Sequence, residues 1–101
     1  DYKCMKELYR VMKKGGWGIF QVPIDYNNQE TYEDSNITDP KEREIHFWQK
    51  DHLRLYGLDY PKKLEKVGFK INIFDPKESL KDFDYEKLRL NPSELIYIAS
   101  K

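Results

Sequence analysis

The chain contains a single cysteine, Cys4, and this scarcity excludes two kinds of structural cross-link. One thiol forms no internal disulfide and cannot by itself supply the four ligands of a structural zinc site. Long apolar runs are missing too, since no stretch approaches the roughly 20 residues that span a bilayer. A charged lead into an apolar stretch is also absent, so we expect no signal peptide and no membrane partner. This composition is typical of the reducing cytoplasm, which is the location we expect.

The chain has no net excess of either charge, because 18 basic residues balance 18 acidic ones. Dedicated nucleic-acid-binding domains usually carry a basic excess, so we expect no nucleic-acid partner. The charge is nevertheless uneven. Residues 1–20 carry a net +3, whereas residues 21–51 contain eight acidic and three basic side chains, for −5. The middle of the chain is therefore a poor surface for phosphates.

The length of 101 residues suits one small domain but is too short for a full Rossmann-like enzyme, which needs several βα units. Asp1 is not an initiator methionine, and a helical pattern begins at once. We therefore expect a piece of a longer protein.

The N-terminal part of the chain has the pattern of a helix followed by a buried strand. The apolar positions of the helix, spaced at three and four residues, are Met5, Leu8, Tyr9 and Met12. They predict a helix over residues 2–13, and Gly15 and Gly16 favour a left-handed stop. The nearly continuous apolar run 17–24 predicts an interior strand of a parallel sheet, buried on both faces, whose pairing should fail near Pro23.

Residues 25–38 are polar and acidic and predict a loop, which is either a lid over a site or a solvated connector. Asp39 followed by Pro40 is typical of a helix start and predicts a helix over residues 40–55. The side chains expected on one face of that helix are Ile45, Trp48, His52 and Leu55. A second helix is predicted over residues 59–67.

The C-terminal part predicts two further strands. Residues 69–74 alternate between apolar and polar side chains, which indicates a strand with one solvated face, and residues 94–100 indicate a final strand. The charged segment 77–92 predicts a loop with a helical turn near 84–89.

Several sequence phrases, taken in order, resemble the second half of a class I S-adenosylmethionine-dependent methyltransferase. The helix and fifth strand of that family are similar to KELYRVMKKGGWGIFQVPI, and the next helix and sixth strand to DYPKKLEKVGFKINIF. The closing seventh strand, which that family inserts antiparallel, is similar to LIYIASK. The stretch QKDHLRLYGLDY resembles a segment of a bacterial type-11-like subgroup.

The resemblance implies an α/β fold, namely the C-terminal part of a Rossmann-like methyltransferase sheet with three strands, flanking helices and an antiparallel last strand. It also implies S-adenosylmethionine as the cofactor of the parent protein and a small-molecule methyl acceptor. The glycine-rich cofactor loop of the family is missing, because Gly15, Gly16 and Gly18 stand at a helix-to-strand turn. No cofactor-binding residue is therefore carried over, and we expect this part alone to be inactive.

The densest polar group of the sequence is the motif DHLRLYG at residues 51–57. His52 can serve as a general base, Arg54 can hold a carboxylate or phosphate, and Tyr56 can donate a hydrogen bond to a substrate. Pro23 ends the buried strand, at the edge that faces the substrate in the resembling family. Plain structural roles compete: His52 half-buried on a helix, Arg54 paired with an acidic neighbour, and Pro23 simply ending the strand.

Other chemically suggestive residues predict structural roles. The carboxylates of the acidic segment are Glu30, Glu33, Asp34 and Asp39, and their spacing does not match a calcium loop, so a solvated loop without metal is favoured. We expect Cys4, Trp17 and Trp48 to pack in the core.

Two functions from different classes follow. The first is the substrate-side half of a methyltransferase, with His52 as the base and Arg54, Tyr56 and Pro23 at the substrate. The alternative is a non-catalytic α/β interaction module derived from a methyltransferase, whose aromatic residues contact a partner. Because strand 17–24 should lack its neighbour, its edge also predicts a homo-oligomer.

Overall fold

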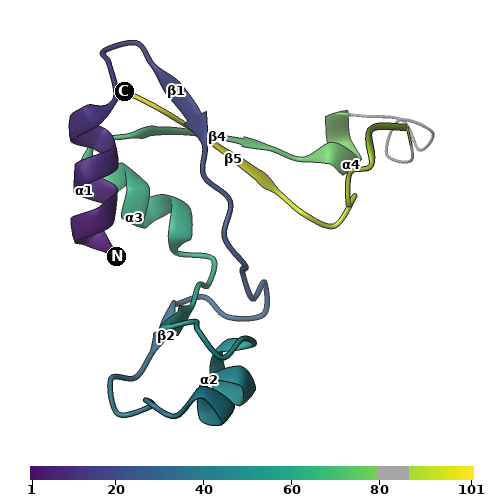
Figure 1. Ribbon diagram of the computed structural model, residues 1–101. Helices are drawn as coiled ribbons and strands as arrows, with labels where there is room; N and C mark the ends of the chain where they lie inside the picture. Colours follow the sequence, from purple (N-terminus) through teal and green to yellow (C-terminus); the bar gives the residue numbers. More distant parts are fainter. Residues whose placement is uncertain (80–86) are drawn as a thin grey trace. The chain divides into compact units, whose positions relative to one another are not determined.

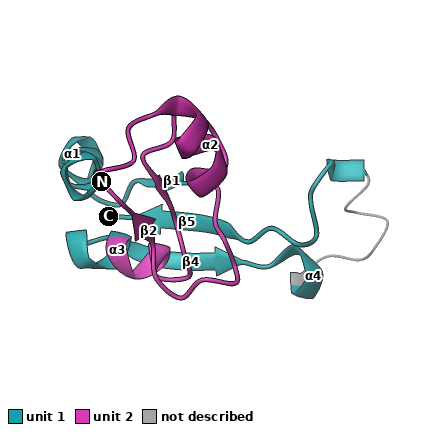
Figure 2. Ribbon diagram, turned by 90° about the horizontal axis from the view of Figure 1, so that it is seen from below, with its two compact units in different colours: residues 1–21, 64–101 teal, residues 22–63 magenta. Residues whose placement is uncertain are grey.

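The computed structural model describes residues 1–79 and 87–101. The elements follow in the order α1 (Tyr2–Val11), β1 (Trp17–Ile19), β2 (Tyr32–Glu33), α2 (Pro40–Phe47), β3 (Arg54–Leu55), α3 (Tyr60–Val67), β4 (Lys70–Phe74), α4 (Pro76–Ser79) and β5 (Ile96–Ser100) (Figure 1). They form two compact units, the first of residues 1–21 and 64–101 and the second of residues 22–63 (Figure 2). None of the helices formed by the described residues has the length and apolar character required to cross a bilayer.

A three-stranded sheet organises the first unit. Its strand order is β1-β5-β4, so the last strand of the chain lies between two earlier ones and runs antiparallel to both. Residues 98–100 of β5 have partners on both sides, and Ala99, for example, lies opposite Gly18 on one side and Ile71 on the other. The chain is therefore mixed α/β, with a small antiparallel sheet whose last strand has the predicted direction.

Alternate residues of β5 supply the centre of the first unit's core. Tyr97 and Ala99 are fully buried, whereas the residues between them stay half-buried, as expected for a sheet covered on one face. Phe69 packs edge-on against Tyr9 and Phe20, with ring centroids 5.1 and 5.2 Å apart. The buried residues of β5 thus lie on one face of the sheet, and Phe69, just before β4, joins this core to Tyr9 of α1 and to Phe20.

The strand predicted over residues 17–24 is shorter and more exposed than expected. Only Trp17–Ile19 pair as a strand, at the edge of the sheet, and the side chains of Trp17 and Ile19 are 68% and 55% exposed. The prediction of an interior strand with a core tryptophan is therefore wrong for this chain. The physical reason is that the described residues provide only one neighbouring strand and cover only one face, so side chains on the other face meet solvent.

A side chain extends the pairing of β1 by two residues. The backbone N–H of Phe20 still donates to Tyr97 O at 3.0 Å. Beyond it, Gln21 Oε1 accepts from the backbone N–H of Tyr97 at 2.8 Å, and Gln21 Nε2 donates to Leu95 O at 3.0 Å. The amide of Gln21 thus takes the place of a peptide group just before the chain turns away at Pro23.

The second unit contains α2 and the two-stranded antiparallel pair β2 and β3. Asp39 caps α2 as predicted, accepting from the backbone N–H of Glu42, and Pro40 occupies the first turn. The helix ends at Phe47 and not at residue 55, because Trp48 adopts a left-handed conformation with φ of 73°. The buried side chains of this unit are Ile24, Phe47, Leu55 and Tyr60.

The early end of α2 overturns the predicted helix face. Ile45 and Trp48 are 71% and 50% exposed, His52 lies in a turn beyond the helix, and Leu55 is buried in β3. Trp48 is therefore not a core anchor. The segment 25–38 also departs from a plain loop, because it contains β2.

The remaining differences concern boundaries and exposure. Helix α1 stops at Val11, two residues early, although Gly15 has the predicted positive φ of 80°. Cys4 is exposed and does not pack in the core, and Ile73 of β4 is 45% exposed. The predicted loop after β4 begins with the short helix α4. Residues 84–86 of the predicted helical turn lie outside the described residues.

Candidate functional site

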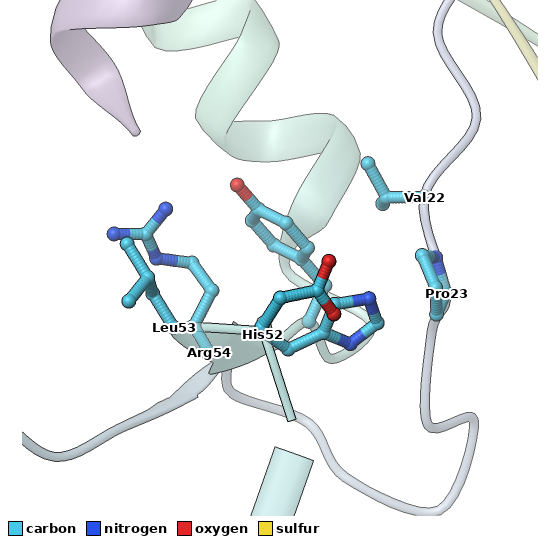
Figure 3. A pocket seen from close by; sticks show the side chains of 7 residues that line it. Val22, Pro23, His52, Leu53 and Arg54 are labelled. Carbon is cyan, nitrogen blue, oxygen red and sulfur yellow. The ribbon is translucent and has the colours of Figure 1, made fainter. Parts of the chain in front are cut away.

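A cavity of about 250 Å³ in the second unit gathers the four predicted site residues (Figure 3). Its lining consists of Val22, Pro23, Asp51, His52, Leu53, Arg54 and Tyr56. Figure 3 shows Pro23 on one wall and His52 on the opposite wall. The volume lies just below the range of about 300–1,000 Å³ typical of ligand pockets, so the cavity suits a small ligand or part of a larger one.

Backbone pairing brings the two walls together. Ile24 forms a parallel bridge with Tyr56, and the backbone N–H of Asp25 donates to Tyr56 O at 2.8 Å. The residues that leave the first strand therefore lie beside the residues around β3, about 30 positions further along the sequence. Val22 and Pro23 thereby become the apolar wall opposite His52.

Gly57 allows a close approach that holds this arrangement. A Cβ atom on Gly57 would lie 2.6 Å from Glu30 O and 2.7 Å from Asn28 O, both rigid backbone atoms. The backbone N–H of Leu58 donates to Asn28 O at 2.9 Å, and the Thr31 hydroxyl donates to Asp59 Oδ1 at 2.7 Å. The first half of the expected lid is thus bound to the segment that follows β3.

The imidazole of His52 is oriented by the end of α2. Its Nδ1 lies 2.8 Å from the backbone oxygen of Phe47. A carbonyl oxygen only accepts, so Nδ1 carries the proton and donates. In the neutral ring Nε2 then has a free lone pair, which is the state that a general base requires. The ring is half-buried, as the structural alternative expected, but in a turn and not on a helix.

Arg54 is engaged by a carboxylate of the protein itself. Its Nε and Nη2 both donate to Glu33 Oε1, at 3.0 and 2.7 Å, across the β2–β3 pair. Burial lowers the pKa of Arg54, but the hydrogen bonds to Glu33 and Tyr56 outweigh it and hold the pKa above its ordinary value. The guanidinium therefore stays charged, and two of its five N–H groups already donate to Glu33.

Tyr56 connects the cavity to α3. Its ring packs edge-on against the ring of Tyr60, with centroids 4.8 Å apart and an interplanar angle of 63°. Tyr56 helps to hold the pKa of the neighbouring Arg54 above its ordinary value. A phenol both donates and accepts, so that its hydroxyl can also donate to a ligand in the cavity.

The sequence does not predict Glu33, the carboxylate partner of Arg54, as a site residue. The sequence predicts Glu33 in a solvated acidic loop, and only its position opposite Arg54 in the β2–β3 register gives it a role. A second polar cluster joins Tyr32, which is distant in the sequence, to His46 and Glu42 of α2. Tyr32 Oη lies 3.1 Å from His46 Nδ1, and His46 Nε2 lies 3.6 Å from Glu42 Oε2, all at the surface of the second unit.

The described residues do not fit the implied cofactor. The backbone N–H of Gly15 donates to Lys101 O at 3.1 Å, and Gly16 O accepts from the backbone N–H of Lys101 at 3.0 Å. These glycines therefore close the sheet and offer no free loop for a cofactor. Within residues 1–79 and 87–101, no group of three or more His, Cys, Asp or Glu side chains is placed to hold a metal ion.

No protein-family model, no curated protein and no solved structure matches this chain. Function must therefore be argued from the strand arrangement and the cavity.

Proposed function

We propose that these 101 residues are the substrate-side part of a longer class I S-adenosylmethionine-dependent methyltransferase. The observation that carries the proposal is the position of β5, which lies between β1 and β4 and is antiparallel to both. The resemblance in the sequence implies such an inserted, antiparallel last strand.

The place of the cavity along the chain supports the same function. In open α/β sheets, ligands bind beyond the carboxyl ends of the strands. The chain leaves β1 at its carboxyl end, and the first residues of the second unit, Val22 and Pro23, line the cavity. The segment that would bind the substrate, residues 22–56, therefore begins just after the carboxyl end of β1.

The residues of the cavity would bind and orient the methyl acceptor. His52 Nε2 can accept a proton from it, Tyr56 can donate a hydrogen bond to it, and Pro23 offers an apolar contact surface. Arg54, held by Glu33, positions Tyr56. Since the glycines of this chain do not fit the cofactor, the cofactor would be bound by other parts of the parent protein.

The test is binding of S-adenosylhomocysteine, measured by calorimetry, to the protein encoded by the complete reading frame that contains these residues. We expect one molecule bound per chain, and no binding to residues 1–101 alone. The His52→Ala variant of the complete protein should bind the cofactor normally but transfer methyl groups at least about 100-fold more slowly. A complete protein that binds no S-adenosylhomocysteine would refute the proposal.

The second candidate is an interaction module without catalysis. It is favoured by the exposure of large apolar side chains, above all Trp17, Ile45 and Trp48. Alanine at both His52 and Arg54 separates the two functions. Lost turnover with an intact fold supports the enzyme, whereas unchanged turnover together with lost partner binding supports the module.

A further inference from the structure

The charge balance of the cavity indicates the chemical class of its ligand. Its lining contains one cation, Arg54, and one anion, Asp51. The cation is neutralised by Glu33, whose Oε1 accepts two hydrogen bonds from the guanidinium. Within the described part of the chain no ion pair neutralises Asp51 in the same way.

The lysine next to Asp51 leaves this balance unchanged. Lys50 and Asp51 both line a neighbouring cavity, but they form no ion pair among the residues described. Residues 22–63 contain nine acidic and six basic side chains, so the unit as a whole also carries negative charge. A field of this sign attracts cations and repels anions.

The hydrogen-bonding groups point to the same class of ligand. His52 Nδ1 donates to Phe47 O, so Nε2 is an acceptor in the neutral ring. The Asp51 carboxylate is an acceptor as well. Two acceptors, the Asp51 carboxylate and His52 Nε2, match a group with several N–H donors. A carboxylate or phosphate would find as donors only the Tyr56 hydroxyl and those N–H groups of the Glu33-bound Arg54 that Glu33 leaves unused.

We propose that the cavity binds a small organic amine in its protonated form and discriminates against carboxylates and phosphates. The ammonium group lies at Asp51 and His52 Nε2, and the apolar part of the ligand packs on Val22, Pro23 and Leu53. Arg54 is not the anchor of an anionic substrate, because Glu33 already occupies it. That this amine is the methyl acceptor rests on the proposed function, whereas the preference for an amine does not.

The test uses benzylamine and benzoate, two probes of similar size and opposite charge at pH 7. Each is titrated into the isotope-labelled 101-residue protein, and the ring resonances of His52 and the signals of Pro23 are followed by NMR. We expect benzylammonium to shift both sets of signals and to bind about three- to tenfold more tightly than benzoate, the range that a partly exposed ion pair supports.

Two variants with matched charge change identify the groups responsible. Asp51→Asn should weaken benzylammonium binding about three- to tenfold, and Glu33→Gln should strengthen benzoate binding by releasing Arg54. Glu30→Gln removes one negative charge from an exposed position of the same segment, outside the cavity lining, and should change neither affinity.

Benzoate binding to the unaltered protein as tightly as benzylammonium would overturn the inference, and so would shifts of either probe confined to residues outside the cavity. The comparison on the unaltered protein decides the question even where Glu33→Gln fails to fold. If the cavity does not prefer benzylammonium but the complete protein binds S-adenosylhomocysteine, the proposed ligand class is wrong and the methyltransferase proposal stands. If the cavity prefers benzylammonium but the complete protein binds no S-adenosylhomocysteine, the protein has an amine site and is not a methyltransferase.

Discussion

Gly57 is the residue at which the second unit can least accept a side chain. We expect Gly57→Ala to lower the free energy of unfolding by about 1–3 kcal/mol, because its Cβ would lie 2.6 Å from a backbone oxygen that cannot move aside without breaking the turn. Urea unfolding followed by tryptophan fluorescence measures the change. Gln29→Ala, at an exposed position in the facing segment, is the control and should stay within about 0.5 kcal/mol of the original.

Single residues also show which site features could be predicted. Residue chemistry and the family resemblance predict a site at His52, Arg54, Tyr56 and Pro23, and the structure brings all four to the lining of one cavity. The partner of Arg54 was not identified, because nothing local relates positions 33 and 54. Their contact depends on a strand register, which is set by long-range pairing.

Helix α2 depends on its first residue. It has eight residues, which is too short to be stable in isolation, and Asp39 satisfies one of the backbone N–H groups at its start. Asp39→Ala should therefore lower the free energy of unfolding by about 1 kcal/mol. Chemical denaturation followed by circular dichroism tests this, with Thr38→Ala as the control. An equal loss in both variants would contradict a capping role.

The side chain of Gln21 is expected to protect the backbone of β5. In Gln21→Leu the N–H of Tyr97, a nearly fully buried residue, loses its acceptor, which costs about 1–3 kcal/mol. The Tyr97 amide should then exchange with solvent about tenfold faster or more, as measured by NMR hydrogen exchange. Gln21→Glu keeps an acceptor oxygen and should keep most of the protection. Unchanged exchange in Gln21→Leu would contradict this role.

Helix ends were the weakest part of the prediction at the scale of elements. The start of α2 was predictable because Asp39 and Pro40 act locally through capping and φ restriction. Its end was not, because Trp48 adopts a left-handed conformation that its side chain disfavours. Phe47, buried next to it, and the carbonyl that binds His52 make this early end part of the tertiary packing.

At the scale of the whole molecule, the edge of the three-stranded sheet is expected to associate. β1 lies at the edge with Trp17 and Ile19 exposed, and such an edge offers unpaired backbone groups to a second copy. Sedimentation velocity over a concentration series should show a dimer or higher oligomer at high concentration. Trp17→Lys should reduce this association, because charge on an edge strand opposes pairing.

Trp48→Lys is the matched control, since Trp48 is exposed as well but lies outside the strands. It should leave the association unchanged. A clean monomer at the highest concentration reached, or equal loss of association in both lysine variants, would contradict pairing through β1. In a parent protein that adds a strand beside β1, the association should disappear.

Signals between near neighbours in the sequence are enough to predict the helix that starts after Asp39, the helix before Gly68 and the strands 70–74 and 96–100. Capping, glycine stops and apolar periodicity act over a few residues, so these signals can be read directly along the chain. The strand order β1-β5-β4, the exposure of Trp17 and the pairing of Glu33 with Arg54 follow from the folded chain and not from local patterns. Each of these depends on contacts between distant positions, whose free energy comes from register and burial that local patterns do not encode.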